Sequence, residues 1–114
     1  MTDREMLELA ALAAGYVVES MRFHGGAWCH PVGEQPDEDG DHPGLFEWNP
    51  LDDDGDIARL EANLRINVTW ISGGVMCGPC MERCADHPDA NTARRKASVR
   101  AAAEVGRRMR EGKA

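Results

Sequence analysis

Residues 91–112 have the sequence NTARRKASVRAAAEVGRRMREG, and this stretch decides the fold class because it is the longest segment with a helical pattern. Asparagine at position 91 suits a helix start and glycine at position 112 suits a helix end. Four apolar residues recur at helical spacing and predict the buried stripe: Ala101, Ala102, Val105 and Met109. The sequence therefore predicts a long C-terminal helix that packs along this stripe.

Two shorter helices precede it, at residues 3–14 and at about 54–64. The first has a capping-box pattern that starts at Thr2, and Gly15 supplies its stop. The second follows the aspartate-rich run 52–56, because carboxylates cap the first amides of a helix and favour the positive end of its dipole. Both segments carry apolar residues at spacings of three and four, which indicates one buried face each.

Four strands fill the spaces between the helices, at residues 16–23, 27–30, 66–71 and 75–77. These segments are rich in β-branched and aromatic residues, and glycine pairs separate the members of each hairpin. The predicted order is α-β-β-α-β-β-α. The sequence thus predicts a single α+β domain over 1–114, with antiparallel hairpins packed against an N-terminal and a long C-terminal helix.

Two segments are expected to lack regular structure, an exposed acidic loop at about 32–46 and a cysteine-containing loop at about 77–90. The first contains glycine, proline and acidic residues with almost nothing apolar. The segment 48–51, Trp-Asn-Pro-Leu, predicts an anchored turn in which a buried Trp48 holds the end of that loop against the core.

Composition excludes several classes of function. The 114 residues carry a formal net charge of −7, which argues against a general binder of nucleic acid or of anionic membranes. The sequence has no apolar run of about 18 residues, the length a spanning helix needs. The first residues are acidic, unlike a signal peptide. We therefore expect a cytoplasmic protein with reduced cysteines.

Charge is segregated along the chain. No lysine or arginine lies between Arg22 and Arg59, a stretch with ten acidic residues, whereas the chain from Arg94 onward has eight basic and two acidic residues. One interpretation is attraction between these parts within the fold. The other is that the acidic loop binds a basic partner surface, such as one that normally holds nucleic acid. The candidate contact residues are Asp37, Glu38, Asp39 and Asp41.

The cysteines near residue 80 allow a zinc hypothesis. Cys77-Gly78-Pro79-Cys80 is followed by Cys84, and two cysteines separated by two residues can turn both sulfurs toward one tetrahedral ion. His87 is the first candidate for the fourth ligand, with His30 and Cys29 as alternatives. Structural zinc sites usually show a second clear pair of ligands, which is missing here.

The same tetrad also occurs in thioredoxin-like enzymes, where a helix after the first cysteine lowers its pKa. Here that helix could run only from residue 81 to 85, and no proline follows Pro88 to face the dithiol. The remaining alternative is a set of reduced, structural thiols. No spacing assembles a catalytic group, so we expect a protein that is not an enzyme.

Two stretches carry a resemblance to a known family. Trp48-Asn49-Pro50-Leu51-Asp52-Asp53-Asp54-Gly55-Asp56 resembles the Trp-Asn-Pro-Leu-x-Asp-Asp-Gly-Asp signature of small phage and prophage proteins, and residues 93–96 with 100–106 resemble their C-terminal helix. These proteins form the phage ABA sandwich domain family. The resemblance implies no enzyme activity and no catalytic residues, and residues 24–45 and 72–90 depart from the family pattern.

Three functions follow as hypotheses. The first is a small, non-enzymatic phage or prophage accessory protein that binds a host protein, with anti-defence inhibitors such as anti-CRISPR proteins as one subclass. The second is a zinc-binding structural or regulatory module, and the third a thiol-disulfide oxidoreductase.

Overall fold

The computed structural model describes residues 1–23 and 25–112. His24, Lys113 and Ala114 lie outside the described residues. Along the chain the elements are α1 (Asp3–Ala14), β1 (Tyr16–Met21), β2 (Ala27–Pro31), β3 (Phe46–Trp48), α2 (Asp54–Leu64), β4 (Val68–Ile71), β5 (Gly74–Cys77), β6 (Cys80–Arg83), a 3-10 turn (Cys84–Asp86) and α3 (Ala90–Arg110).

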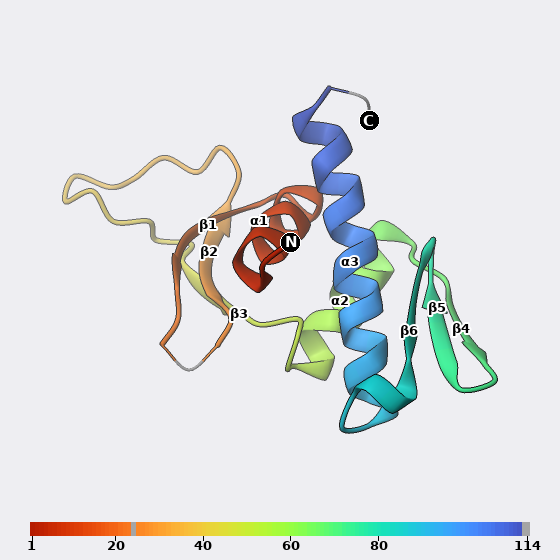
Figure 1. The fold of residues 1–114 in the computed structure, drawn as a ribbon. Coiled ribbons are helices and arrows are strands. Elements are labelled where there is room, and N and C mark those ends of the chain that lie inside the picture. Colours follow the sequence, from red (N-terminus) through yellow and green to blue (C-terminus); the bar gives the residue numbers. More distant parts are fainter. Residues whose placement is uncertain (24, 113–114) are drawn as a thin grey trace.

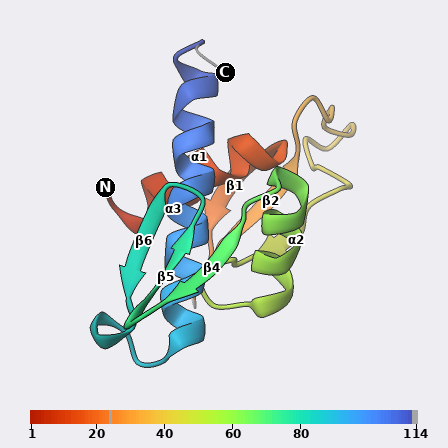
Figure 2. The ribbon, with the colours of Figure 1, turned by 90° about the vertical axis from the view of Figure 1, so that its right-hand side faces the viewer.

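The helices lie between two antiparallel sheets of three strands each, with strand orders β1-β2-β3 and β4-β5-β6. Figure 1 shows α3 in the middle, with α1 and the first sheet on one side and the second sheet on the other. Figure 2, turned by 90°, shows β4, β5 and β6 in front of α3. The predicted α+β class is therefore confirmed. None of the described helices is both long and apolar enough to cross a bilayer.

The predicted helix ends are confirmed for α1 and α2. Thr2 accepts a hydrogen bond from the Glu5 amide, and Gly15 has the left-handed φ of 87° that ends α1. Asp53 caps α2 by accepting from the Asp56 amide. At α3 the prediction was wrong by two residues, because Asp89 and not Asn91 is the cap, and its carboxylate accepts from the backbone amide three residues later.

The predicted stripe of α3 is only half correct. Ala101 and Ala102 are buried, but Val105 and Met109 are about 40% exposed. The face that meets the rest of the molecule is made of small residues, and Gly106 lies on it against the backbone of Leu9 in α1. Small side chains allow close approach of two helices, so the contact follows residue size more than hydrophobicity.

Each sheet has one strand that the sequence did not predict. β3 adds to the first hairpin, with Trp48 opposite Ala27. β6 adds to the second, with Cys80 opposite Cys77 across the Gly78-Pro79 turn. The expectation of an irregular segment after residue 77 was therefore wrong. Strands of three or four residues contain too few alternations to show the two-residue period of a strand, and only pairing with a neighbour makes them visible.

The predicted anchor at the end of the acidic loop is confirmed. Trp48 is 4% exposed and Pro50 is fully buried. The Tyr16 ring meets the Trp48 ring edge-on, with centroids 5.7 Å apart. The main core surrounds this contact between α1, the first sheet, α2 and α3, and a smaller core of Val75, Cys77, Ala93 and Ala97 lies between α3 and the second sheet.

Candidate functional site

The acidic loop between β2 and β3 extends away from the helices, as the yellow-orange segment of Figure 1 shows. All four predicted contact residues are exposed, and in the described part of the chain none of them forms an ion pair with lysine or arginine. These residues are Asp37, Glu38, Asp39 and Asp41.

The tip of this loop has a defined conformation. The Asp37 carboxylate accepts hydrogen bonds from the backbone amides of Asp39 and Asp41, at 3.0 and 2.9 Å. The Asp37 amide also donates to the carbonyl of Asp41 at 2.7 Å. One ligand oxygen from each of these three aspartates lies within 4.8 Å of the others. The tip therefore presents concentrated negative charge on an ordered turn.

Five of the seven basic residues of α3 are paired with acidic residues, most of which lie in other segments. Arg95 donates to Asp54 in α2 at 2.5 Å, and Lys96 pairs with Asp3 in α1 at 3.1 Å. Arg94 pairs with Glu61, Arg100 pairs with Glu82, and Arg107 pairs both with Glu104 of the same helix and with Glu111. The internal attraction predicted from the charge pattern thus involves the helices and β6, and it leaves the acidic loop out.

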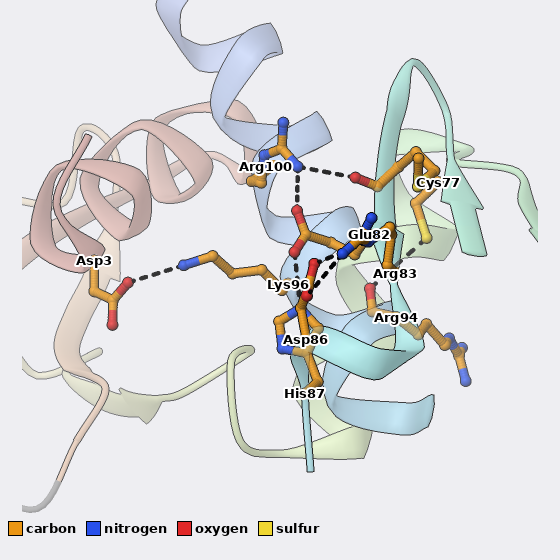
Figure 3. Close-up of polar contacts among 10 residues, drawn as sticks. Asp3, Cys77, Glu82, Arg83, Asp86, His87, Arg94, Lys96 and Arg100 are labelled. Atoms are coloured by element: carbon orange, nitrogen blue, oxygen red, sulfur yellow. Dashed lines mark hydrogen bonds and ion pairs between the residues drawn. The ribbon is translucent and has the colours of Figure 1, made fainter. Parts of the chain in front are cut away.

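Two of these pairs tie α3 to its neighbours through acids that are largely shielded from solvent, Glu61 and Glu82. Glu61 is 7% exposed, accepts from Arg94, and also accepts from the Ser98 hydroxyl at 2.6 Å. Figure 3 shows Glu82 between Arg100 and His87, with the His87 ring donating to it at 2.8 Å. Burial alone would raise the pKa of Glu82, but the hydrogen bonds from His87 and Arg100 outweigh it and lower that pKa.

The structure does not gather the four predicted zinc ligands around one point. Cys77 is buried in the small core, and its thiol points at the Arg94 carbonyl at 3.7 Å (Figure 3). Cys80 lines a surface pocket together with Ala101 and Glu104 of α3, and Cys84 is partly exposed and packs against the same small core as Cys77. His87 is bonded to Glu82. Among the described residues, the ligand atoms of these four side chains are not gathered within 4.8 Å of one another. Zinc at these residues stays a prediction.

The three buried thiols are poorly suited to redox chemistry. Burial raises the pKa of Cys29 to about 11, with the Asp56 carboxylate adding to the effect. Burial also raises the pKa of Cys77 and of Cys80. The reactive form of cysteine is the thiolate, and a raised pKa makes it scarce at neutral pH. The two cysteines of the tetrad, moreover, lie on paired strands and not at a helix start.

A histidine pair at the base of the acidic loop was missed as a unit by the sequence analysis. The rings of His30 in β2 and His42 in the loop are stacked, with centroids 3.7 Å apart and planes 4° apart. Glu19 of β1 lies beside His30, and Glu34 lies beside His42. These four residues show no repeated spacing in the sequence, so only the pairing of β1 with β2 and the path of the loop bring them together.

No family model matches the chain, and no curated protein or solved structure matches it.

Proposed function

We propose that this protein is a non-enzymatic binding protein whose acidic loop contacts a basic surface of a host protein. The observation that carries the proposal is the difference between the two charged parts of the chain. Five of the seven basic residues of α3 are paired with acids within the fold, whereas the four loop carboxylates face solvent without a basic partner in the described residues.

Electrostatics supports this role in two ways. Complementary charge steers association and raises its rate by about 10- to 1000-fold, and an ordered loop loses less entropy on binding than a random one. A partner surface built to hold nucleic acid would supply the matching positive charge. We place the protein among small phage or prophage accessory proteins in the bacterial cytoplasm, with anti-defence inhibitors, including anti-CRISPR proteins, as the subclass to test first.

The test starts from capture of partners from host lysate by the intact protein, followed by association kinetics with each purified partner. Replacement of the loop acids by their amides (Asp37→Asn, Glu38→Gln, Asp39→Asn and Asp41→Asn) should slow association about tenfold or more. The new amide at position 37 would keep an acceptor oxygen for the turn, so the loop conformation should persist. Raising the salt concentration should weaken association of the parent protein, because the screening length falls from about 10 Å at 0.1 M to about 3 Å at 1 M.

A second quadruple variant is the matched control, and it changes exposed acids outside the loop: Glu5→Gln, Glu8→Gln, Asp52→Asn and Asp86→Asn. Both variants change the net charge from −7 to −3, so they differ in where the charge is removed and in two exposed ion pairs that only the control loses, Arg4 with Glu8 and Arg83 with Asp86. An equal decrease of the association rate in both variants would show that net charge alone matters. Binding that ignores salt and both variants would contradict the proposal, and would direct attention to the exposed methionines Met76 and Met81, which lie opposite each other on β5 and β6.

A further inference from the structure

We infer that Glu19, His30 and His42 form a binding site for a divalent zinc-type cation, with Glu34 holding His42 in position. One ligand atom from each of the three residues lies within 4.8 Å of the other two. Two imidazoles and a carboxylate are a usual donor set for zinc, whereas calcium and magnesium prefer oxygen alone. This inference concerns the base of the loop and does not depend on the proposed partner.

Both histidines are oriented as metal ligands usually are. The Nδ1 atom of His30 lies 3.0 Å from the carbonyl oxygen of Pro31, and the Nδ1 atom of His42 lies 3.2 Å from Oε1 of Glu34. Carbonyl and carboxylate oxygens only accept hydrogen bonds, so each ring donates through Nδ1. In the neutral rings the lone pair is then on Nε2. A ligating histidine commonly has its other ring nitrogen bonded to a carbonyl or carboxylate in this way.

The contact between His30 and Glu19 points to a cation between them. Nε2 of His30 lies 3.4 Å from Oε2 of Glu19. A lone pair and a carboxylate oxygen repel unless a proton or a metal ion lies between them. Four ligands at about 2.1 Å from a zinc ion form a tetrahedron whose edge is about 3.4 Å. The distance between these two atoms equals that edge.

The stacking of the two rings sets what binding of one ion would require. With centroids 3.7 Å and planes 4° apart, the lone pairs of the two rings lie in parallel planes and do not converge on one point as the rings stand. Two neutral rings can share one ion after a tilt that turns their Nε2 atoms toward it. His42 lies on the loop and not in a strand, so its ring can tilt without breaking a sheet hydrogen bond.

The surroundings also suit a bound ion. His30 is 6% exposed and His42 and Glu34 are largely shielded, while the Glu19 side chain is about half exposed and leaves a path for entry. A cation held here would join β1, β2 and the loop, and would partly neutralise the carboxylates around it. It would therefore hold the base of the loop that carries the exposed aspartates.

The experiment titrates the full, reduced protein with zinc chloride in competition with a chromophoric chelator. Glu19→Gln and His42→Gln should each weaken zinc binding by about tenfold or more, since each removes one ligand. Cys84→Ser and His87→Gln are the matched controls, and zinc binding should be unchanged in them. Circular dichroism in the presence of chelator should show the same fold in all four variants. Cobalt should bind without a thiolate charge-transfer band.

Three results would overturn the inference. The first is no stoichiometric zinc binding at micromolar protein. The second is binding that survives Glu19→Gln and His42→Gln, which would place the ion elsewhere, for example at the aspartates of the loop tip. The third is binding lost in Cys84→Ser or His87→Gln together with a thiolate band in the cobalt form, which would assign the metal to the cysteines.

Discussion

Replacing Gly106 by alanine should destabilise the protein, although the same change stabilises most helices. An ideal Cβ on Gly106 would lie 2.6 Å from the carbonyl carbon of Leu9, and closer still to its oxygen. Non-bonded carbon atoms prefer separations of about 3.5–4.0 Å, and the contact with the Leu9 oxygen is the shorter of the two, so α1 and α3 would have to move apart by more than about 1 Å. Both contact atoms belong to the backbone, so no side-chain rotation can relieve the clash.

The magnitude follows from two opposing effects. Alanine gains about 1 kcal/mol over glycine in helix propensity. Overpacking costs about 1–3 kcal/mol and more where backbone must shift, and here the shift separates the two helices that build the main core. We expect the upper part of that range to apply, which leaves a net loss of about 2 kcal/mol in the free energy of unfolding, or about 8 °C in melting temperature.

Urea denaturation followed by circular dichroism measures this loss, with Gly55→Ala as the matched control. Gly55 is also helical, but a Cβ there would meet only the ends of the Asp53 and Arg59 side chains, at 3.1 and 3.4 Å. Its replacement should change the free energy of unfolding by less than about 1 kcal/mol. If Gly106→Ala proved as stable as the parent or more so, the close crossing of α1 and α3 would be wrong.

Three further predictions test other parts of the structure. Trp48→Ala should cost about 3–5 kcal/mol, since it removes a buried indole beside Tyr16; an unchanged thermal melt would mean that Trp48 is exposed. In the native protein at neutral pH one thiol, that of Cys84, should react quickly with a disulfide reagent, and the three buried thiols with raised pKa should react only on unfolding; fast reaction of all four would contradict their burial. Glu82→Gln should destabilise the protein by about 1–3 kcal/mol at pH 7. Because the fold lowers the pKa of Glu82, its contribution is present above the ordinary carboxyl range and is lost as pH falls through the lowered pKa, so parent and variant should converge in acid, and a difference that is constant with pH would refute this origin.

Much of the fold could be predicted because its signals are local. Thr2 and Gly15 mark the ends of α1 by their own hydrogen-bonding and conformational properties, and Asp53 marks the start of α2 in the same way. Each of these acts within three or four residues, so it can be recognised without knowing what lies nearby in space. β3 and β6 have no such signal, because pairing with a distant strand stabilises them.

The candidate site shows the same division. Composition alone located the acidic loop and its exposure, since a segment without apolar residues cannot be buried. It could not show that the bases of α3 pair with α1, α2 and β6 instead of the loop, because ion pairs such as Lys96 with Asp3 join residues far apart in the chain. Proximity in sequence made the cysteines one candidate metal site, but among the described residues their sulfur atoms are not gathered around one point.

The sequence by itself determined the three helices, the hairpins, the buried tryptophan and the exposed acidic loop, because periodicity, capping and polarity act over short distances. Tertiary structure alone decided which charges are neutralised and which side chains meet. It placed Gly106 against Leu9, turned Val105 toward solvent, and stacked His30 on His42. These contacts depend on how whole helices and sheets pack together. The spacing of residues along the chain does not show how far apart two such elements lie in space.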